Sequence, residues 1–228
     1  MLGLWRQVVR LGFHLLYHQF AWMYDAVAWI VSGGEWSAWR RTALQCVNPP
    51  DDALVLEVGF GTGALHVEMA ARGWRMIGLD RSRAMARITR SRLSRAGVRT
   101  SLITASAVAI PLGASTVDAI VCTFPSDYIV DAAALGEFRR ALKPGAEIAV
   151  VVHGVLTRGM WRRVTDALFR VTGQGSIVAD RVPSHDQLVT RYRRLTAAFR
   201  AAELDVRPIP MTTPNGYAVV LTGRSAAK

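Results

Sequence analysis

The stretch LVLEVGFGTG, residues 54–63, decides the fold. Its first half is a short apolar run typical of a buried strand, and its second half is a glycine-rich turn. Glycine adopts unusual backbone dihedrals and lets a ligand approach the main chain closely. A helix that follows from about Ala64 directs free N–H groups at the turn, and such groups favour a carboxylate or a phosphate. The stretch therefore predicts a strand, a ligand-binding turn and a helix.

Strands and helices alternate downstream of this turn. We expect helices over residues 64–72, 82–96, 132–142, 158–171 and 185–202, and further strands over residues 75–79, 101–104, 117–123, 147–152, 205–210 and 217–222. Asn215-Gly216 is a strong hairpin signal between the last two strands. Such alternation predicts an α/β fold, doubly wound, with a mostly parallel seven-stranded sheet and an antiparallel C-terminal hairpin. Ligands of these sheets bind beyond the carboxyl ends of the strands, where the strand order reverses.

The N-terminal segment has a different pattern. Residues 1–47 have helical spacing of apolar positions, interrupted by glycines at Gly33 and Gly34. A turn cluster at 48–52 then marks a boundary. We expect residues 1–47 to form a helical lid or substrate-access segment, and residues 48–228 to form the ligand-binding domain.

The composition limits the function classes. The chain of 228 residues carries a net charge of +11, and 26 of its 28 basic residues are Arg. This excess of positive charge suits anionic partners such as nucleic acid, acidic lipid or a phosphorylated substrate. Alternatively, it reflects the general amino-acid composition of the chain and has no function. Cys46 and Cys122 lie in apolar stretches and predict no disulfide, so the cytoplasm is the expected compartment. No apolar run reaches the length of a membrane span, and no metal site is predicted.

Two acidic residues frame the glycine turn. The turn also fits the dinucleotide pattern G-x-G-x-x-G/A, so a nicotinamide or flavin enzyme is an alternative. Glu57 stands two residues before Gly59, where a carboxylate suits a cationic ligand and repels a diphosphate. Asp80 closes the second strand, where an acid can accept both hydroxyls of a ribose, or can cap the helix that follows.

Several motifs together resemble the class I S-adenosylmethionine-dependent methyltransferases, and their order and spacing match that family over about residues 55–153. They are Val55–Gly63, Gly78–Asp80, Ala107 with Ile110-Pro111, Val117–Val121 and Glu137–Gly145. Phe20–Asp25 and Trp36–Arg41 are more loosely similar to the N-terminal helices of the ubiquinone/menaquinone C-methyltransferase branch.

The resemblance implies a Rossmann-like methyltransferase fold and S-adenosylmethionine as cofactor, with S-adenosylhomocysteine as product. It places the methionine end of the cofactor on Glu57, Gly59, Gly61, Thr62 and Gly63. The ribose would contact Asp80, and the adenine would lie near Met85, Ser106 and Ala107, with Thr123 lining the site. Ser106 departs from the Asp or Asn usual in the family, which removes a charge-assisted hydrogen bond to adenine.

Methyl transfer from a sulfonium needs alignment and exclusion of water, and it needs a base only if the acceptor must lose a proton. His153 and Tyr24 are the catalytic candidates, although a histidine that caps or satisfies a loop is the simpler interpretation of His153. Phe124-Pro125-Ser126-Asp127-Tyr128 differs from the Asn/Asp-Pro-Pro-Tyr/Phe signature of base methylation, which argues against nucleic acid. The substrate-binding candidates are Tyr17, His18, Phe124 and Tyr128.

The surface points to a lipophilic acceptor, such as a quinone precursor or a phospholipid, reached at an anionic membrane surface. The N-terminal residues 1–31 are apolar nearly all round, and residues 81–99 carry an acid-free run of Arg. A solvated helix face explains the Arg run equally simply. Two alternatives stay open: an N- or O-methyltransferase of a soluble metabolite, and a non-catalytic binding protein on the same fold. The sequence predicts neither the acceptor atom nor the oligomeric state.

Overall fold

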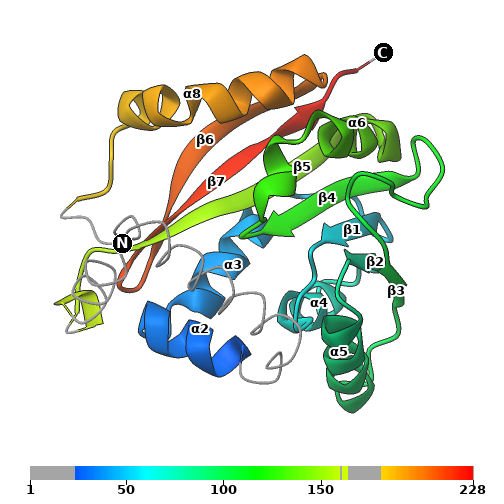
Figure 1. Ribbon diagram of the computed structural model, residues 1–228, viewed down its shortest axis with the longest axis horizontal. Coiled ribbons are helices and arrows are strands. Elements are labelled where there is room, and N and C mark those ends of the chain that lie inside the picture. The colour runs from blue at the N-terminus through cyan, green and yellow to red at the C-terminus, as the bar shows by residue number, and fades with distance from the viewer. Residues whose placement is uncertain (1–23, 160, 164–180, 228) are drawn as a thin grey trace, which may run out of the picture.

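A single sheet organises the chain. The structure, a computed structural model, describes residues 24–159, 161–163 and 181–227 (Figure 1). Seven strands lie in the order β3-β2-β1-β4-β5-β7-β6. Their bounds are β1 Leu54–Val58, β2 Arg75–Asp80, β3 Ser101–Thr104, β4 Val117–Thr123, β5 Leu142–Leu156, β6 Leu204–Thr213 and β7 Gly216–Ser225.

The direction of the strands confirms the predicted fold class. Neighbours among β1 to β5 pair in parallel, whereas β7 pairs antiparallel with both β5 and β6. The order reverses at β1, because β2 lies on one side of it and β4 on the other. The glycine turn at the end of β1 therefore stands at the topological switch point of the sheet, where ligands of such folds bind.

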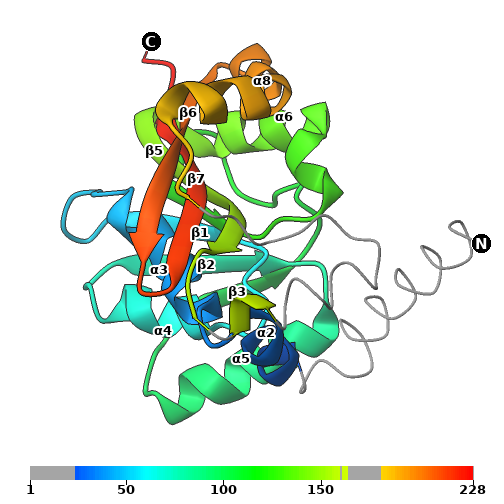
Figure 2. The same cartoon turned by 90° about the vertical axis from the view of Figure 1, so that its left-hand side faces the viewer.

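Helices cover both faces of the sheet, as Figures 1 and 2 show. Trp39 of α3 packs with Val55, Val121 and Val151 on one face. Phe138 of α6 and Phe199 of α8 pack against the strands on the other face. Because successive strand residues point to opposite faces, the apolar strands are buried on both sides. The helices are α2 Tyr24–Ser32, α3 Trp36–Gln45, α4 Ala64–Ala70, α5 Arg83–Arg95, the 3-10 turn η2 Asp127–Val130, α6 Ala132–Ala141 and α8 His185–Ala201.

Strand β5 is longer than predicted. The expected strand was 147–152 after a turn at Lys143-Pro144-Gly145, but β5 runs through that turn. Its register shifts there, since Val117 pairs with Leu142 and Ala119 pairs with Glu147. The turn is therefore an irregularity within the strand. The far end of β5 extends to Leu156 because β7 runs beside it and supplies partners.

The two C-terminal strands are also longer than predicted, at 10 residues each, because they pair with each other along their whole length. Helix α8 begins as expected, with a capping box between Ser184 and Gln187. Most of the helix predicted at 158–171 lies outside the described residues. Across the described ranges, no helix has the length and apolar character needed to cross a membrane.

Candidate functional site

The glycine turn is a bare, left-handed segment. Gly59, Gly61 and Gly63 have φ of 76°, 52° and 73°, a region that favours glycine. A side chain at Gly61 would meet no atom within 4 Å, so this part of the turn is open to a ligand. At Gly63 a Cβ would lie 2.4 Å from Thr89 Cγ2, so this glycine is needed for packing. The turn therefore combines an open surface with a fixed position against α5.

Asp80 holds the turn from the neighbouring strand. One carboxylate oxygen accepts the Gly61 N–H at 2.9 Å and the other accepts the Ser82 N–H at 2.8 Å. Burial raises the pKa of Asp80, against the lowering effect of these hydrogen bonds. The Ser82 hydroxyl, and not Asp80, caps α5 by accepting the Met85 N–H. The carboxylate can accept more than two hydrogen bonds, so it keeps capacity for ligand hydroxyls.

Glu57 has a partner that the sequence did not reveal. It is 1% exposed, and its Oε2 accepts a hydrogen bond from Nδ1 of His66 in α4, which is fully buried. Nε2 of His66 has no hydrogen-bond partner within the described part of the chain. A histidine on the buried side of the helix that follows the turn was the available clue. The pair lies under the glycine turn, where Phe60 meets the His66 ring edge-on.

The expected adenine contacts gather at the ends of β2 and β3. Asp80 and Thr104 lie side by side in the two strands, and the loop carrying Ser106 and Ala107 follows. Met85 is fully buried against Phe60 and does not line an open surface. Ser106 is half-buried, and its hydroxyl accepts the Val108 N–H at 3.4 Å.

The N-terminal helix is tied to the turn by three side chains. Asp25 of α2 accepts the Thr62 hydroxyl at 2.8 Å and forms an ion pair with Arg92 of α5 at 2.5 Å. Arg92 also donates to the Thr62 carbonyl at 2.9 Å. These contacts lower the pKa of Asp25, although desolvation opposes them. We call this set the α2 latch, defined by Asp25, Thr62 and Arg92.

Aromatic residues after β4 lie beside the turn. Thr123 ends β4, and Phe124 follows with a φ of 50° and stacks on Trp36 at 4.1 Å. The Tyr128 hydroxyl lies 3.0 Å from Cys122 Sγ and donates to the Val58 carbonyl at 3.4 Å. It would also lie 3.1 Å from a Cβ at Gly59. Tyr128 thus stands over the end of β1, and Phe124 is turned toward α3.

His153 lies in the carboxyl half of β5, two residues beyond Val151, the partner of Thr123. Its Nδ1 is 2.7 Å from the hydroxyl of Tyr192 in α8. Desolvation and the Arg191 charge lower the pKa of His153. Burial raises the pKa of Tyr192 to about 12. Tyr192 is a functional candidate that the sequence did not single out, because α8 is remote from β5 in the chain.

The side chains of three predicted residues lie outside the described part of the chain. Tyr17 and His18 lie outside the described residues. Tyr24 begins α2, but its side chain lies outside the described part.

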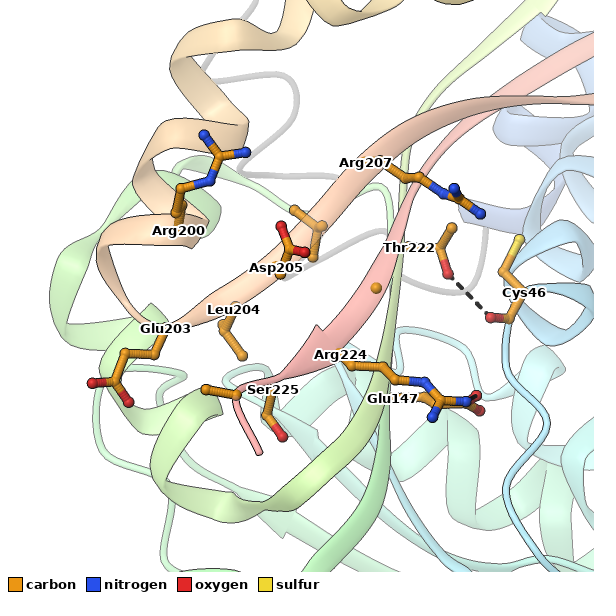
Figure 3. Close-up of a pocket in the computed structure, with 13 residues that line it drawn as sticks. Cys46, Glu147, Arg200, Glu203, Leu204, Asp205, Arg207, Thr222, Arg224 and Ser225 are labelled. Atoms are coloured by element: carbon orange, nitrogen blue, oxygen red, sulfur yellow. Dashed lines mark hydrogen bonds and ion pairs between the residues drawn. The ribbon is translucent and has the colours of Figure 1, made fainter. Parts of the chain in front are cut away.

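A hollow lies at the opposite end of the sheet, and Figure 3 shows the side chains that line it. It has a volume of about 880 Å³ and is lined by the start of β6 and the end of β7. Arg224 there pairs with Glu147 at 2.9 Å, at the amino end of β5. The parallel strands place the glycine turn at their carboxyl ends, so this hollow is separate from the candidate site.

Comparisons with known proteins relate the segment that carries this site to methyltransferases. Residues 55–145 match the family model described as "Methyltransferase domain". The chain is 27% identical over 152 residues to a ubiquinone/menaquinone biosynthesis C-methyltransferase of Geobacter sulfurreducens, covering 64% of this chain and 59% of that protein. It is 29% identical over 139 residues to a demethylmenaquinone methyltransferase of Thermus thermophilus, covering 60% and 63%. The chain spans about six tenths of the length of these relatives.

Solved structures share the fold. The [4+2]-cyclase SpnF matches with a TM-score of 0.61 at 15% identity, over 85% of this chain and 82% of that chain. Fold likeness at this identity carries no function by itself. The family model and the curated relatives together confirm the predicted resemblance to class I S-adenosylmethionine-dependent methyltransferases, with a looser likeness to the quinone C-methyltransferases.

Proposed function

Because residues 55–145 match a methyltransferase domain, we propose that this chain transfers the methyl group of S-adenosylmethionine to a lipophilic acceptor. The observation that carries the proposal is the glycine turn at the switch point, framed by Glu57 below and Asp80 beside it. A carboxylate under the turn suits the cationic methionine end of this cofactor and opposes a dinucleotide diphosphate.

The described residues fit the cofactor. The open Gly61 leaves room for a ligand against the backbone, and Asp80 keeps acceptor capacity for ribose hydroxyls. Ser106 and Ala107 would flank the adenine. Met85 packs against Phe60 and would support this part of the site from below without touching the ligand. Gly59, Thr62 and Gly63 would shape the methionine end, with Thr123 at its edge. When bound, S-adenosylmethionine supplies an already activated methyl group.

The proposed acceptor is a quinone precursor or another lipid. The names of the curated relatives support a quinone-type acceptor. Tyr128 stands over the end of β1, and the Phe124–Trp36 stack adds an aromatic surface nearby. The proposed lid, residues 1–47 with Tyr17, His18 and Tyr24, would cover this region. Trp29 and Ile30 of α2 are 56% and 51% exposed, which supports a place at a membrane surface.

Proton removal would fall to His153. The lowered pKa keeps its ring neutral near pH 7, so it can accept a proton from the acceptor. The Tyr192 hydroxyl is hydrogen-bonded to Nδ1 of His153 and would orient the imidazole ring. The protein otherwise aligns the acceptor with the methyl group and excludes water.

Calorimetry and a transfer assay test the proposal. S-adenosylmethionine should bind, and a nicotinamide dinucleotide should not. Asp80→Asn should weaken cofactor binding roughly 10- to 150-fold, the equivalent of about 1.5–3 kcal/mol for a hydrogen bond to a charged group. Labelled methyl should pass to a demethylmenaquinol probe. A different outcome is that the cofactor binds while the methyl group passes to soluble phenols or amines and not to this probe. That result would show that the acceptor is a soluble metabolite and would contradict the lipophilic acceptor. No cofactor binding would favour the non-catalytic alternative.

A further inference from the structure

One flank of α5 carries an unusual row of charge. Between Asp80 and Asp118 the chain has seven Arg and neither Asp nor Glu. Arg83, Arg87 and Arg90 are spaced four and three residues apart, so they lie on the same side of the helix. All three are exposed. Arg92 lies on the other flank, where it belongs to the α2 latch.

The three side chains line a hollow against the edge of the sheet. Together with Ala86 and Thr104 they line an open hollow of about 510 Å³. Ala86 is 1% exposed and forms a small, closed floor. Thr104 comes from β3, the outermost strand beside α5 (Figure 1). We name this hollow the α5 arginine groove, defined by Arg83, Ala86, Arg87, Arg90 and Thr104.

The groove is electrostatically unfavourable when it holds no anion. Within the described ranges, Arg83, Arg87 and Arg90 form no ion pair or hydrogen bond through their side chains. Like charges three and four residues apart destabilise a helix. Arg83 also stands in the first turn of α5, where no acid is present and where the helix dipole disfavours a cation. Helix capping by Ser82 does not relieve this repulsion.

We propose that the α5 arginine groove is a binding site for a phosphate or diphosphate group, carried either by a free ligand or by a lipid headgroup. Guanidinium groups bind phosphate through paired N–H donors, and the Thr104 hydroxyl adds a donor from the facing strand. A bound anion removes the repulsion along α5. The site adjoins the Asp80 region and is independent of methyl transfer.

Thermal unfolding with inorganic pyrophosphate tests the free-ligand form of the site. Sodium pyrophosphate should raise the melting temperature above that in sodium chloride of equal ionic strength. The triple variant R83Q/R87Q/R90Q should lose this difference. The matched control R75Q/R95Q/R99Q removes the same charge from exposed positions outside the groove and should keep it. S-adenosylmethionine binding is measured in parallel, and its failure would bear on the proposed function alone.

Flotation with vesicles tests the headgroup form. Vesicles of phosphatidylcholine with phosphatidylglycerol should carry the wild-type chain and the control, but not the groove variant, if the phosphate belongs to a lipid. A pyrophosphate effect without this difference in flotation assigns the groove to a free ligand. Equal loss in the groove variant and the control, or no response to either probe, would overturn the proposal.

Discussion

At the scale of single residues, the buried Glu57 side chain depends on the hydrogen bond from His66. Both side chains are buried, and Nδ1 of His66 donates to the Glu57 carboxylate. A buried carboxylate without a donor is costly, because desolvation is no longer offset. His66 therefore holds the Glu57 side chain in its orientation beneath the turn.

His66→Leu should destabilise the fold by about 1–3 kcal/mol, the usual cost of leaving a buried polar group without its hydrogen bond. His66→Asn keeps an N–H donor close to the position of Nδ1 and should recover part of the loss. Urea denaturation measures both variants, and calorimetry with S-adenosylmethionine shows whether affinity follows. Equal stability of the leucine variant and the wild type would contradict the role given to His66.

The His153 proposal predicts a pH dependence. Its folded-state pKa lies below the ordinary histidine value of about 6.5. The neutral base is therefore populated at pH 7, and methyl transfer should fall as the pH drops through this lowered pKa. Stability should fall over the same range, because the unfolded chain binds the proton more tightly. His153→Gln should reduce kcat by about 10²- to 10⁴-fold and remove the acidic limb of the rate profile.

A transfer assay with demethylmenaquinol across pH 5–8 provides the measurement. Tyr192→Phe is the companion variant, since it removes the partner of Nδ1 and should lower kcat with little change in KM. An unchanged profile in His153→Gln would exclude His153 as the base.

At the scale of elements, local patterns predicted most of the fold. The apolar run of β1 and the glycines after it specify that unit without help from distant residues, and Ser184 with Gln187 specifies the start of α8. The ends of β5 were not predictable, because Leu142 at its amino end pairs with β4 and its carboxyl end pairs with β7.

The same division applies to the site. Glycines and acids at strand ends carry a local pattern, so Gly61 and Asp80 were predicted and lie together. Tyr192 and the α2 latch depend on contacts between elements that are remote in sequence, and no local pattern marks them. His66 is only nine residues from Glu57, and its place on the buried side of α4 was the available clue.

Contact between α3 and β5 gives a sharp test of packing. A Cβ at Gly154 would lie 2.1 Å from the ring of Trp39. Gly154→Ala should therefore destabilise the chain by about 1–3 kcal/mol through overpacking. Gly136 in α6 is a matched control, since a Cβ there meets nothing within 4 Å. Gly136→Ala should stabilise the chain by about 0.5–1 kcal/mol, because alanine favours helix. Thermal unfolding distinguishes the two signs, and a neutral Gly154→Ala would contradict the packing described.

At the scale of the whole molecule, charge opposes compactness. The net charge of +11 produces self-repulsion that salt screens. Raising sodium chloride from about 10 mM to about 100 mM shortens the Debye length from about 30 Å to about 10 Å. The melting temperature should rise over this range, and R95Q/R99Q should show a shallower rise. A fall with salt would mean that attractive pairs outweigh the repulsion.

The α2 latch has a consequence for the order of events. Thr62 belongs to the glycine turn, and its hydroxyl and carbonyl are held from α2 and α5 together. Whatever moves α2 must break or re-form contacts with this turn. Binding free energies are reciprocal, so an acceptor that favours the docked α2 raises cofactor affinity by the same factor by which the cofactor raises acceptor affinity. If the proposed cofactor and acceptor both favour the docked α2, Asp25 couples the two ligands, and each should bind more tightly in the presence of the other.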